Sequence, residues 1–440
     1  MSMNKKQEIL KLVKEYIQES YEPWQEGDWI HYAGPVFDDK EYVAAINSLL
    51  DKWLILGDKG LEFERQFPKY LGKRHGVLVN SGSSANLLMM GLFTSKYLKD
   101  KYPKRTKIIT PVSCFPTTIN PILFYGFQPV FIDVTLPNLN LNLDQVEEAA
   151  KDPDVRFITF AHTLGVPPNM DRLMEIVRKY NLIFLEDTCD ALDSKWGDKL
   201  LGSFGHVSTC SFYPAHHITI GEGGFVATDS IVDNGVLLKL RDWGRGCMCK
   251  GKEANLLPNG ICGTRFSNWF PNHPEIVIDH KYVFDEIGFN FKPLELQAAI
   301  GLEQIKKIPE FTKARKRNYQ LMYDMFKPYE EFFHLPEVDK KADPSWFAFL
   351  LTLKDNVPFT REEFTQCLEK NKIQTRPNFA GNILYHPGYS HLLSTEKITK
   401  FKVADKSVKD SFFLGLSPLA TDSQISYISK IVDEFMRGKF

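Results

Sequence analysis

The sequence predicts an α/β protein in which a large domain, built on a mostly parallel β-sheet covered by helices, is followed by a smaller α+β domain. Short apolar runs alternate with helix-length segments between about residues 50 and 300. These runs are hydrophobic on both faces, which is typical of buried parallel strands. Beyond Leu302 long amphipathic helices surround one further strand candidate, which indicates a second, smaller domain.

The expected elements follow in chain order. Apolar residues at helical spacing predict an amphipathic helix within the first 20 residues. Strands are expected at 75–80, 107–111, 128–134, 155–162, 181–187 and 346–353. Helices are expected at 302–326, where the Lys and Arg residues should cover a solvated face, at 360–370, and at 421–436, where Thr421 and Gln424 can form a capping box. The predicted parts are an N-terminal helical segment (1–40), a large domain (41–300) and a C-terminal domain (301–440).

Composition excludes several classes of function. The 440 residues carry a formal net charge of -1, so nothing in the bulk charge favours binding to nucleic acid or to an anionic membrane. Charged residues interrupt the N-terminal segment, and no later apolar run is long enough to span a bilayer, so a cytoplasmic protein is expected. Seven cysteines are an odd number without an export signal, which favours reduced thiols or metal ligands over disulfides.

Two stretches predict a site for an anionic ligand. In "NSGSSANLL" a turn with Gly82, Ser83 and Ser84 joins a strand to a helix, where backbone N–H groups and the helix dipole favour an anion. In "LEDTCDA" Glu186 and Asp187 stand at the carboxyl end of a strand, the edge of an open α/β sheet where ligands bind.

Taken together, six stretches between residues 80 and 301 resemble, in order, the DegT-type sugar aminotransferases, which are fold-type I pyridoxal phosphate (PLP) enzymes acting on nucleotide-linked keto sugars: "NSGSSA", "PVSCFPTTINPI", "FIDV", "LEDTCDA", "SFYPAHHITIGEGG" and "GFNFKPLELQAAIG". The resemblance makes residues 41–300 the cofactor-binding domain. It implies that Gly82, Ser83, Ser84 and Ser211 hold the cofactor phosphate, that Phe115 stacks on the pyridine ring, and that Asp187 pairs with the ring nitrogen.

The same resemblance implies a homodimer, because Asn290 in "GFN" would reach the cofactor phosphate of the neighbouring subunit. Asp190 is expected in the cofactor site, at a position where aminotransferases of this family commonly carry Gln.

His216 stands where the family carries the lysine that tethers PLP. Imidazole cannot form that stable imine, so the cofactor is expected to be bound non-covalently as pyridoxamine phosphate (PMP). A histidine can act as a general base near neutral pH. The resemblance then implies that His216 removes a proton from C4′ of the PMP adduct of a 4-keto sugar, so that the C3 hydroxyl is expelled. His217 is expected to have a structural role or to contact the substrate.

Four cysteines, Cys189, Cys247, Cys249 and Cys262, resemble the four-cysteine pattern of the iron-sulfur dehydrase branch of the family. The last three belong to an expected cysteine-rich insertion at 247–262. Four thiolates can hold a [2Fe-2S] cluster or a tetrahedral zinc, and spacing alone does not separate the two. The resemblance favours [2Fe-2S].

The resulting hypothesis is a PMP- and [2Fe-2S]-dependent dehydrase that removes the C3 hydroxyl of a nucleotide-linked 4-keto-6-deoxyhexose, with CDP as the nucleotide by resemblance, in 3,6-dideoxyhexose biosynthesis for lipopolysaccharide O-antigens. An NAD(P)H-dependent iron-sulfur flavoprotein reductase is the implied electron donor, because no dinucleotide fingerprint is present. Two alternatives stay open: a PMP-only sugar 3-dehydratase with structural zinc, and a non-enzymatic sugar-nucleotide-binding regulator.

Overall fold

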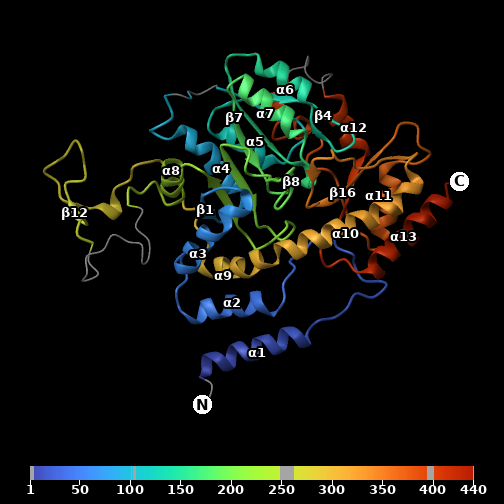
Figure 1. The fold of residues 1–440 in the computed structure, drawn as a ribbon, viewed down its shortest axis with the longest axis horizontal. Helices are drawn as coiled ribbons and strands as arrows, with labels where there is room; N and C mark the ends of the chain where they lie inside the picture. The colour runs from blue at the N-terminus through green and yellow to red at the C-terminus, as the bar shows by residue number, and fades with distance from the viewer. Residues whose placement is uncertain (1–3, 101, 103–105, 248–261, 394–400, 440) are drawn as a thin grey trace.

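A seven-stranded sheet forms the centre of the large domain in the computed structural model, which describes residues 4–100, 102, 106–247, 262–393 and 401–439 (Figure 1). The strand order is β1-β11-β10-β7-β6-β2-β3, and all seven strands run in the same direction except β11. The predicted α/β class and mostly parallel sheet are therefore confirmed. The strands are β1 (His75–Val79), β2 (Lys107–Pro111), β3 (Gln128–Ile132), β6 (Val155–Ala161), β7 (Ile183–Asp187), β10 (Val207–Ser211) and β11 (Gly224–Thr228).

Helices cover both faces of this sheet, because successive apolar side chains of each strand point to opposite sides. On β2, Ile108 packs in the cluster that includes helices α4 and α8, whereas the next residue, Ile109, packs in the cluster that includes α6 and α7. The helices are α4 (Gly82–Gly91), α5 (Pro116–Phe124), α6 (Leu143–Ala150), α7 (Met170–Lys179) and α8 (Ile231–Arg241). Two small sheets accompany it. One pairs β4 (Val134–Thr135) with β5 (Asn140–Leu141), and the other has three strands, β15 (Ala342–Asp343), β8 (Lys195–Trp196) and β9 (Lys199–Leu200).

The C-terminal part of the chain forms a second, antiparallel sheet of four strands in the order β14-β16-β18-β17. Its core holds Phe326, Phe349 and Phe364, each fully buried. The elements are β14 (Phe333–His334), β16 (Ala348–Leu353), β17 (Thr375–Arg376), β18 (Ser411–Gly415), α11 (Arg361–Lys370), α12 (Lys402–Asp410) and α13 (Asp422–Arg437). The capping box of Thr421 and Gln424 is present at the start of α13. The boundaries at residues 40 and 300 stay a prediction.

The predicted start of the long helix, at about residue 302, is wrong. Helix α9 (Glu295–Gln304) ends first, a 3-10 turn follows, and α10 (Ile308–Phe326) begins with Pro309 in its first turn. Proline fits the first turn of a helix but has no N–H for a bond inside one, so the chain restarts its helix there. The basic face of α10 is also not wholly solvated, because Arg315 is only 4% exposed.

The N-terminal segment reaches the second sheet. Helix α1 (Lys5–Glu19) has no buried residue and packs against α2 (Asp39–Leu50), which is followed by α3 (Asp58–Gln66). Between α1 and α2 the backbone N–H of Ile30 donates to the carbonyl of Lys372 at 2.7 Å, and the N–H of Gln374 donates back to Ile30 at 3.0 Å. The segment therefore joins the edge of the sheet at β17.

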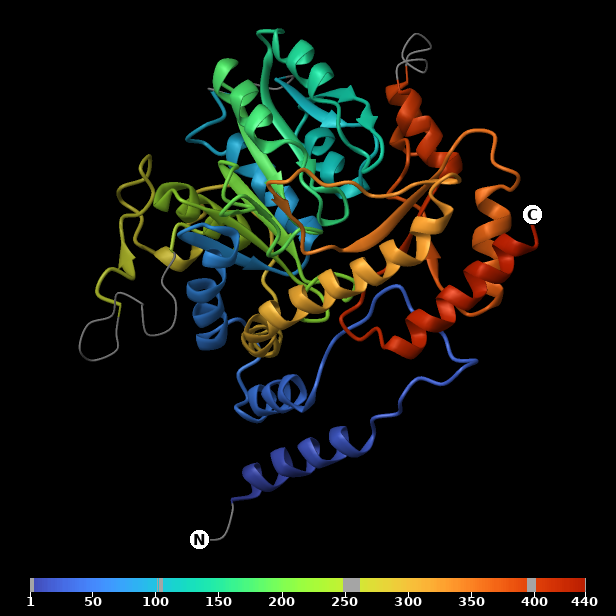
Figure 2. The same cartoon turned by 45° about the vertical axis from the view of Figure 1, so that its right-hand side comes forward.

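Residues 262–288 form a projection that we call the arm. It carries a two-stranded ladder, β12 (Phe266–Ser267) with β13 (Ile278–Asp279), and stands out from the body on the side opposite the C-terminus in both views (Figures 1 and 2). Its apolar side chains are exposed, reaching 64% at Phe266 and 94% at Ile287. No helix in the described part of the chain is long and apolar enough to cross a membrane.

Candidate active site

A cavity of about 450 Å³ opens at the carboxyl ends of the parallel strands. Asp187 ends β7 and Ser211 ends β10, while the turn after β1 supplies Gly82 and Ser83 to the same wall. Parallel strands direct their carboxyl ends to one edge of a sheet, and for this reason residues distant in sequence meet here. The cavity has the size of a small-molecule site.

The serine turn at the start of α4 lies against the end of β10. A Cβ placed on Gly82 would lie 2.5 Å from the Cβ of Ser211, so only glycine allows this close approach. The hydroxyl of Ser81 caps the helix by accepting from the N–H of Ser84 at 3.0 Å. Gly82, Ser83 and Ser211 line the cavity, whereas Ser84 is engaged with Ser81 and does not line it.

Asp187 lines the cavity and accepts hydrogen bonds from three donors. It is 2% exposed and accepts from the Asn86 amide at 2.8 Å, from the Thr118 hydroxyl at 3.2 Å and from the backbone N–H of Cys189 at 3.0 Å. The three donors hold the buried Asp187 side chain in one position. Asn86 and Thr118 are absent from the predicted site, although Asn86 lies within the quoted serine turn.

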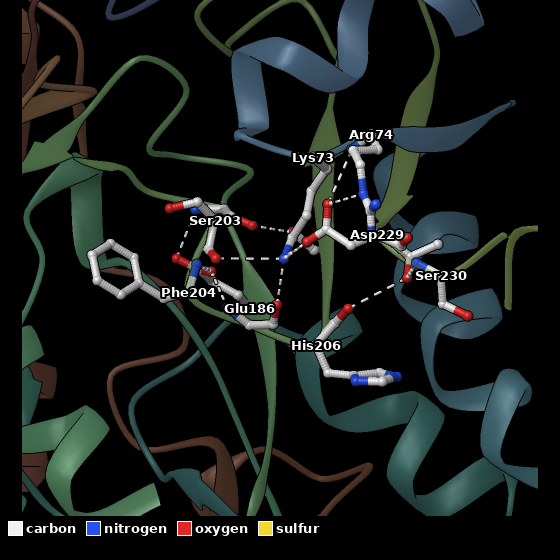
Figure 3. Close-up of polar contacts among 12 residues, drawn as sticks. Lys73, Arg74, Glu186, Ser203, Phe204, His206, Asp229 and Ser230 are labelled. Carbon is white, nitrogen blue, oxygen red and sulfur yellow. Dashed lines mark hydrogen bonds and ion pairs between the residues drawn. The ribbon is translucent and has the colours of Figure 1, made fainter. Parts of the chain in front are cut away.

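Glu186 faces away from the cavity, because neighbouring residues of a strand point to opposite faces. Its carboxylate accepts from the backbone N–H groups of Gly202, Phe204 and Gly205 at 2.7, 3.0 and 2.7 Å (Figure 3). Lys73 donates to the carbonyl of Gly205 at 2.6 Å and ties this loop to the start of β1. The two acidic residues of "LEDTCDA" therefore have different roles, and Glu186 supports the loop that leads into β10.

His216 lines the cavity and contacts Asp190. The Nδ1 atom of His216 lies 3.3 Å from a carboxylate oxygen of Asp190, and the two side chains are 16% and 7% exposed. Burial raises the pKa of Asp190, while the contact with His216 opposes that rise. Asp190, predicted among the cofactor-binding residues, thus lies directly against His216. A carboxylate at Nδ1 favours the tautomer whose other ring nitrogen can accept a proton.

His217 lies behind this pair and outside the cavity. It is 5% exposed and its Nε2 atom lies 3.2 Å from the carbonyl of Ser345. Burial, with the positive charge of Arg315, holds the pKa of His217 well below its usual value. Burial also lowers the pKa of Arg315 to about 10, which still leaves the guanidinium charged at neutral pH. His217 is therefore a neutral structural residue.

The cavity wall also includes residues that sequence patterns did not predict. Tyr32 comes from the N-terminal segment, and Phe347 and Arg376 come from the second sheet. The Phe347 ring lies 5.5 Å from the His216 ring, between centroids. Phe115, which was predicted, lines the cavity at the start of α5 and is 52% exposed. Long-range contacts of this kind leave no local signal in the chain.

Of the predicted metal ligands and the predicted cross-subunit residue Asn290, only Cys189 lines the cavity in the described part of the chain. Cys189 lines the cavity, and burial together with the charge of Asp187 raises the pKa of its thiol. Cys262 lies at the base of the arm, 3.5 Å from Nε2 of His280, and Cys247 is half-buried. Cys249 lies outside the described residues. Asn290 is exposed and does not line the cavity of its own chain.

No group of three His, Cys, Asp or Glu side chains in the described ranges is arranged to hold a metal ion. Cys249 lies outside this part of the chain, so the four-cysteine cluster stays a prediction. PMP fits the cavity, because a glycine-dependent helix start with hydroxyls faces the same cavity as a buried carboxyl group and a phenyl ring. When bound, PMP supplies an amine for the sugar carbonyl and an electron sink.

The sheet topology and the cavity define a fold-type I PLP-dependent enzyme. The family model described as "DegT/DnrJ/EryC1/StrS aminotransferase family" matches residues 37–433, and the chain belongs to this family.

Three relatives illustrate the similarity. The lipopolysaccharide biosynthesis protein RfbH of Salmonella typhimurium is 36% identical over 99% of both chains. The dTDP-4-dehydro-2,6-dideoxy-D-glucose 3-dehydratase of Saccharopolyspora spinosa is 37% identical over 98% of this chain and 92% of its own. A crystal structure of GDP-4-keto-6-deoxymannose-3-dehydratase with a trapped PLP-glutamate geminal diamine has a TM-score of 0.76 and 28% identity, and covers 91% of this chain and 99% of that one.

Proposed function

We propose that the chain is a PMP-dependent dehydrase that removes the C3 hydroxyl of a nucleotide-linked 4-keto-6-deoxyhexose. The observation that carries the proposal is the His216–Asp190 contact in a cavity floored by Asp187. The family's tethering lysine is replaced by a residue that can accept a proton but cannot form the tether. Relatives named as 3-dehydratases of 4-keto sugars support the same reaction.

The residues act in the following way. Asp187 would pair with the ring nitrogen of PMP, and the helix start at Gly82 with Ser83 and Ser211 would hold its phosphate. His216 would act as the base toward the C4′ proton and would protonate the departing C3 hydroxyl. Asp190 holds the imidazole by Nδ1 and stabilises the imidazolium. Complete deoxygenation consumes two electrons and two protons and releases one water.

The source of these electrons is part of the proposal. Cys189, Cys247, Cys249 and Cys262 are proposed to hold a [2Fe-2S] cluster, supported by their spacing and by the resemblance to the iron-sulfur branch. A separate NAD(P)H-dependent iron-sulfur flavoprotein reductase would supply electrons. The described residues of one chain do not assemble this site, so we derive no step through it. Anaerobic iron and sulfide analysis, with Cys367→Ser as a control for Cys262→Ser, tests the cluster.

A homodimer is proposed from the arm and from the loop between α2 and α3. Trp53, Leu54 and Ile55 are 55%, 56% and 63% exposed, and the arm exposes Phe266 and Ile287 further. Apolar surface of this extent favours coverage by another protein surface. Asn290, exposed beside the arm, is proposed to reach the phosphate of the partner subunit. CDP as the nucleotide, a cytoplasmic location and a role in O-antigen dideoxysugar synthesis are proposed from the resemblance.

The test of the reaction is incubation of the protein with PMP, the CDP-linked 4-keto-6-deoxy sugar, NADH and an iron-sulfur flavoprotein reductase that supplies the two electrons. We expect loss of the C3 hydroxyl and solvent hydrogen in the product, detected by mass spectrometry in deuterated water. His216→Lys should abolish this dehydration and produce the visible absorption of PLP bound through a lysine imine. Unchanged dehydration by that variant would exclude His216 as the base. Structural zinc in place of iron would leave the PMP-only dehydratase as the function.

A further inference from the structure

Thr209 on β10 contacts the cavity only through another side chain. It is fully buried and does not line the cavity, and its hydroxyl donates to Oδ1 of Asn86 at 2.6 Å. Nδ2 of Asn86 donates in turn to Oδ2 of Asp187 at 2.8 Å and to the carbonyl of Thr117 at 3.3 Å. Both ends of the Asn86 amide are therefore engaged, and two hydrogen bonds connect Thr209 to the Asp187 carboxyl group.

The register of the sheet explains why these residues meet. Thr209 of β10 is paired with Asp187 of β7 in a parallel ladder, and side chains paired in this way lie on the same face. Ser211, two positions further along β10, points to that face too and lines the cavity. On α4, Asn86 follows Gly82 by four residues, so the two share one side of the helix. Helix α4 thus contacts β10 at two points, one at its first residue and one a turn later.

The Thr209 hydroxyl determines which end of the Asn86 amide faces Asp187. An amide has an acceptor oxygen and a donor nitrogen of similar size, so it can bind either way round. In the described part of the chain, Thr209 is the one donor to Oδ1 of Asn86. Rotation of the amide by half a turn would place that oxygen against the oxygens of Asp187 and Thr117. Loss of the hydroxyl would leave Oδ1 a buried acceptor without a donor, a cost large enough to move the side chain.

We propose that Thr209 is a positioning residue that holds the Asp187 carboxyl group in place by way of Asn86. The inference rests on the proposed function, because Asp187 is the proposed partner of the ring nitrogen of PMP. The same helix serves both ends of the cofactor site, since α4 begins at the proposed phosphate site and contacts Asp187 one turn later.

Thr110 provides a matched comparison. It is also a fully buried threonine, on β2 of the same sheet, but its hydroxyl has no hydrogen-bond partner among the described residues. Replacement by valine keeps the branched shape of threonine and removes its hydroxyl. Thr110→Val therefore measures the cost of that chemical change by itself, whereas Thr209→Val also breaks the hydrogen bond to Asn86.

The test follows PMP labelled with ¹⁵N in its ring, by NMR of the bound cofactor, together with PMP affinity by fluorescence titration. The ¹⁵N shift of a pyridine ring reports the proton and the hydrogen bond at its nitrogen. We expect Thr209→Val to move this shift toward that of the unprotonated ring and to weaken PMP binding about tenfold, since a buried hydrogen-bonded network is broken. Thr209→Ser, which keeps a hydroxyl, should behave like the parent, and so should Thr110→Val.

A second substitution shows whether the effect passes through Asn86. In an Asn86→Ala background, Thr209→Val should have no further effect on the ¹⁵N shift, because the connecting amide is gone. A further change of the shift there would overturn the inference. Thr209→Ala also lacks the hydroxyl but is smaller than valine, so the two variants together separate loss of the hydroxyl from altered packing.

The outcomes distinguish this inference from the proposed function. If the parent chain binds no PMP, both fail. If the parent binds PMP and Thr209→Val matches it in shift and affinity, only this inference fails. A lower melting temperature of Thr209→Val with an unchanged ¹⁵N shift would assign Thr209 a purely structural role and would also overturn the inference.

Discussion

The cavity buries polar side chains that are hydrogen-bonded, whereas the arm exposes apolar side chains. In the cavity Asp187 is 2% exposed and has three donors from its own chain, whereas on the arm Ile287 is 94% exposed and has no apolar cover. Burial fixes a charged group only when its donors are already in place, and the cavity provides them within one chain. The arm provides apolar surface instead. The cavity is thus lined by ordered side chains of a single chain, whereas the arm leaves its apolar surface uncovered.

The largest expected effect removes the proton acceptor from the cavity. His216→Asn should lower dehydration about 10²-fold to 10⁴-fold, the usual contribution of a general base, and leave PMP binding intact. The measurement is single-turnover dehydration together with the absorbance of bound PMP. His206→Asn is the control, because His206 is on the surface beside Asp233. A loss of less than tenfold would contradict the role of His216.

A smaller loss of dehydration is expected when Asp190, which contacts His216, is changed. Asp190→Asn should lower dehydration about 100-fold, less than the ~10⁴-fold that a wrong imidazole tautomer costs in a serine protease. The reason is that the imidazole loses the carboxylate 3.3 Å from Nδ1 but keeps its place against Phe347. Steady-state kinetics should show the loss in kcat, with KM changed little. Asp190→Glu should recover part of the rate, and a loss confined to KM would refute this positioning.

The arm is expected to affect association and not the cavity. Ile287→Asp should weaken the proposed dimer about tenfold or more, because a charge replaces apolar surface that association buries. Sedimentation velocity over a dilution series measures the effect. Leu419→Asp, a similar change at a site 56% exposed near α13, serves as the control. Dimers of unchanged stability in the Ile287 variant would show that the arm lies outside the interface.

The smallest expected effect is a loss of folding stability at acid pH, caused by the buried His217. The pKa of His217 is lower in the folded chain than its unfolded value near 6.5, so the unfolded chain binds the proton more readily. This contribution to stability is complete above that pH and is lost as the pH falls below it, by about 1.4 kcal/mol per pH unit. Urea unfolding between pH 7 and 5 should show this slope, and His217→Asn should remove it. An equal slope in the variant would assign the titration to another group.

Local patterns predicted most of the secondary structure. The strands at 107–111 and 155–162 occur as β2 and β6, since continuous apolar runs are an intrinsic property of buried parallel strands. The prediction of one helix at 302–326 was wrong at its start. The helical spacing of apolar residues continues across Pro309, whereas the backbone hydrogen bonds of the helix do not. The prediction that Arg315 lies on a solvated face was wrong for a different reason. Its burial depends on the carbonyls of Trp346 and Phe347, about thirty positions away in the chain.

The candidate site was predictable to the extent that its residues occur in short motifs. Gly82, Asp187, Ser211 and His216 meet in one cavity, because β1, β7 and β10 run in the same direction and end at one edge of the sheet. Asn86 and Thr118 also occur in the quoted stretches, but their roles as donors to Asp187 depend on where α4 and α5 place them, which the sequence does not show. The roles of the site residues stay predictions that the experiments above test, as does the gathering of the four cysteines.

The position of Tyr32 on the cavity wall has a practical consequence for any shortened form of this protein. The family model begins at residue 37, after Tyr32. A recombinant product trimmed to the shared segment 37–433 would keep every residue that lines the cavity except Tyr32. It would lose the aromatic ring that lies against the Arg376 guanidinium, along with the backbone pairing of Ile30 to β17. Such a product could bind PMP normally and still be a misleading reagent for measuring substrate preference.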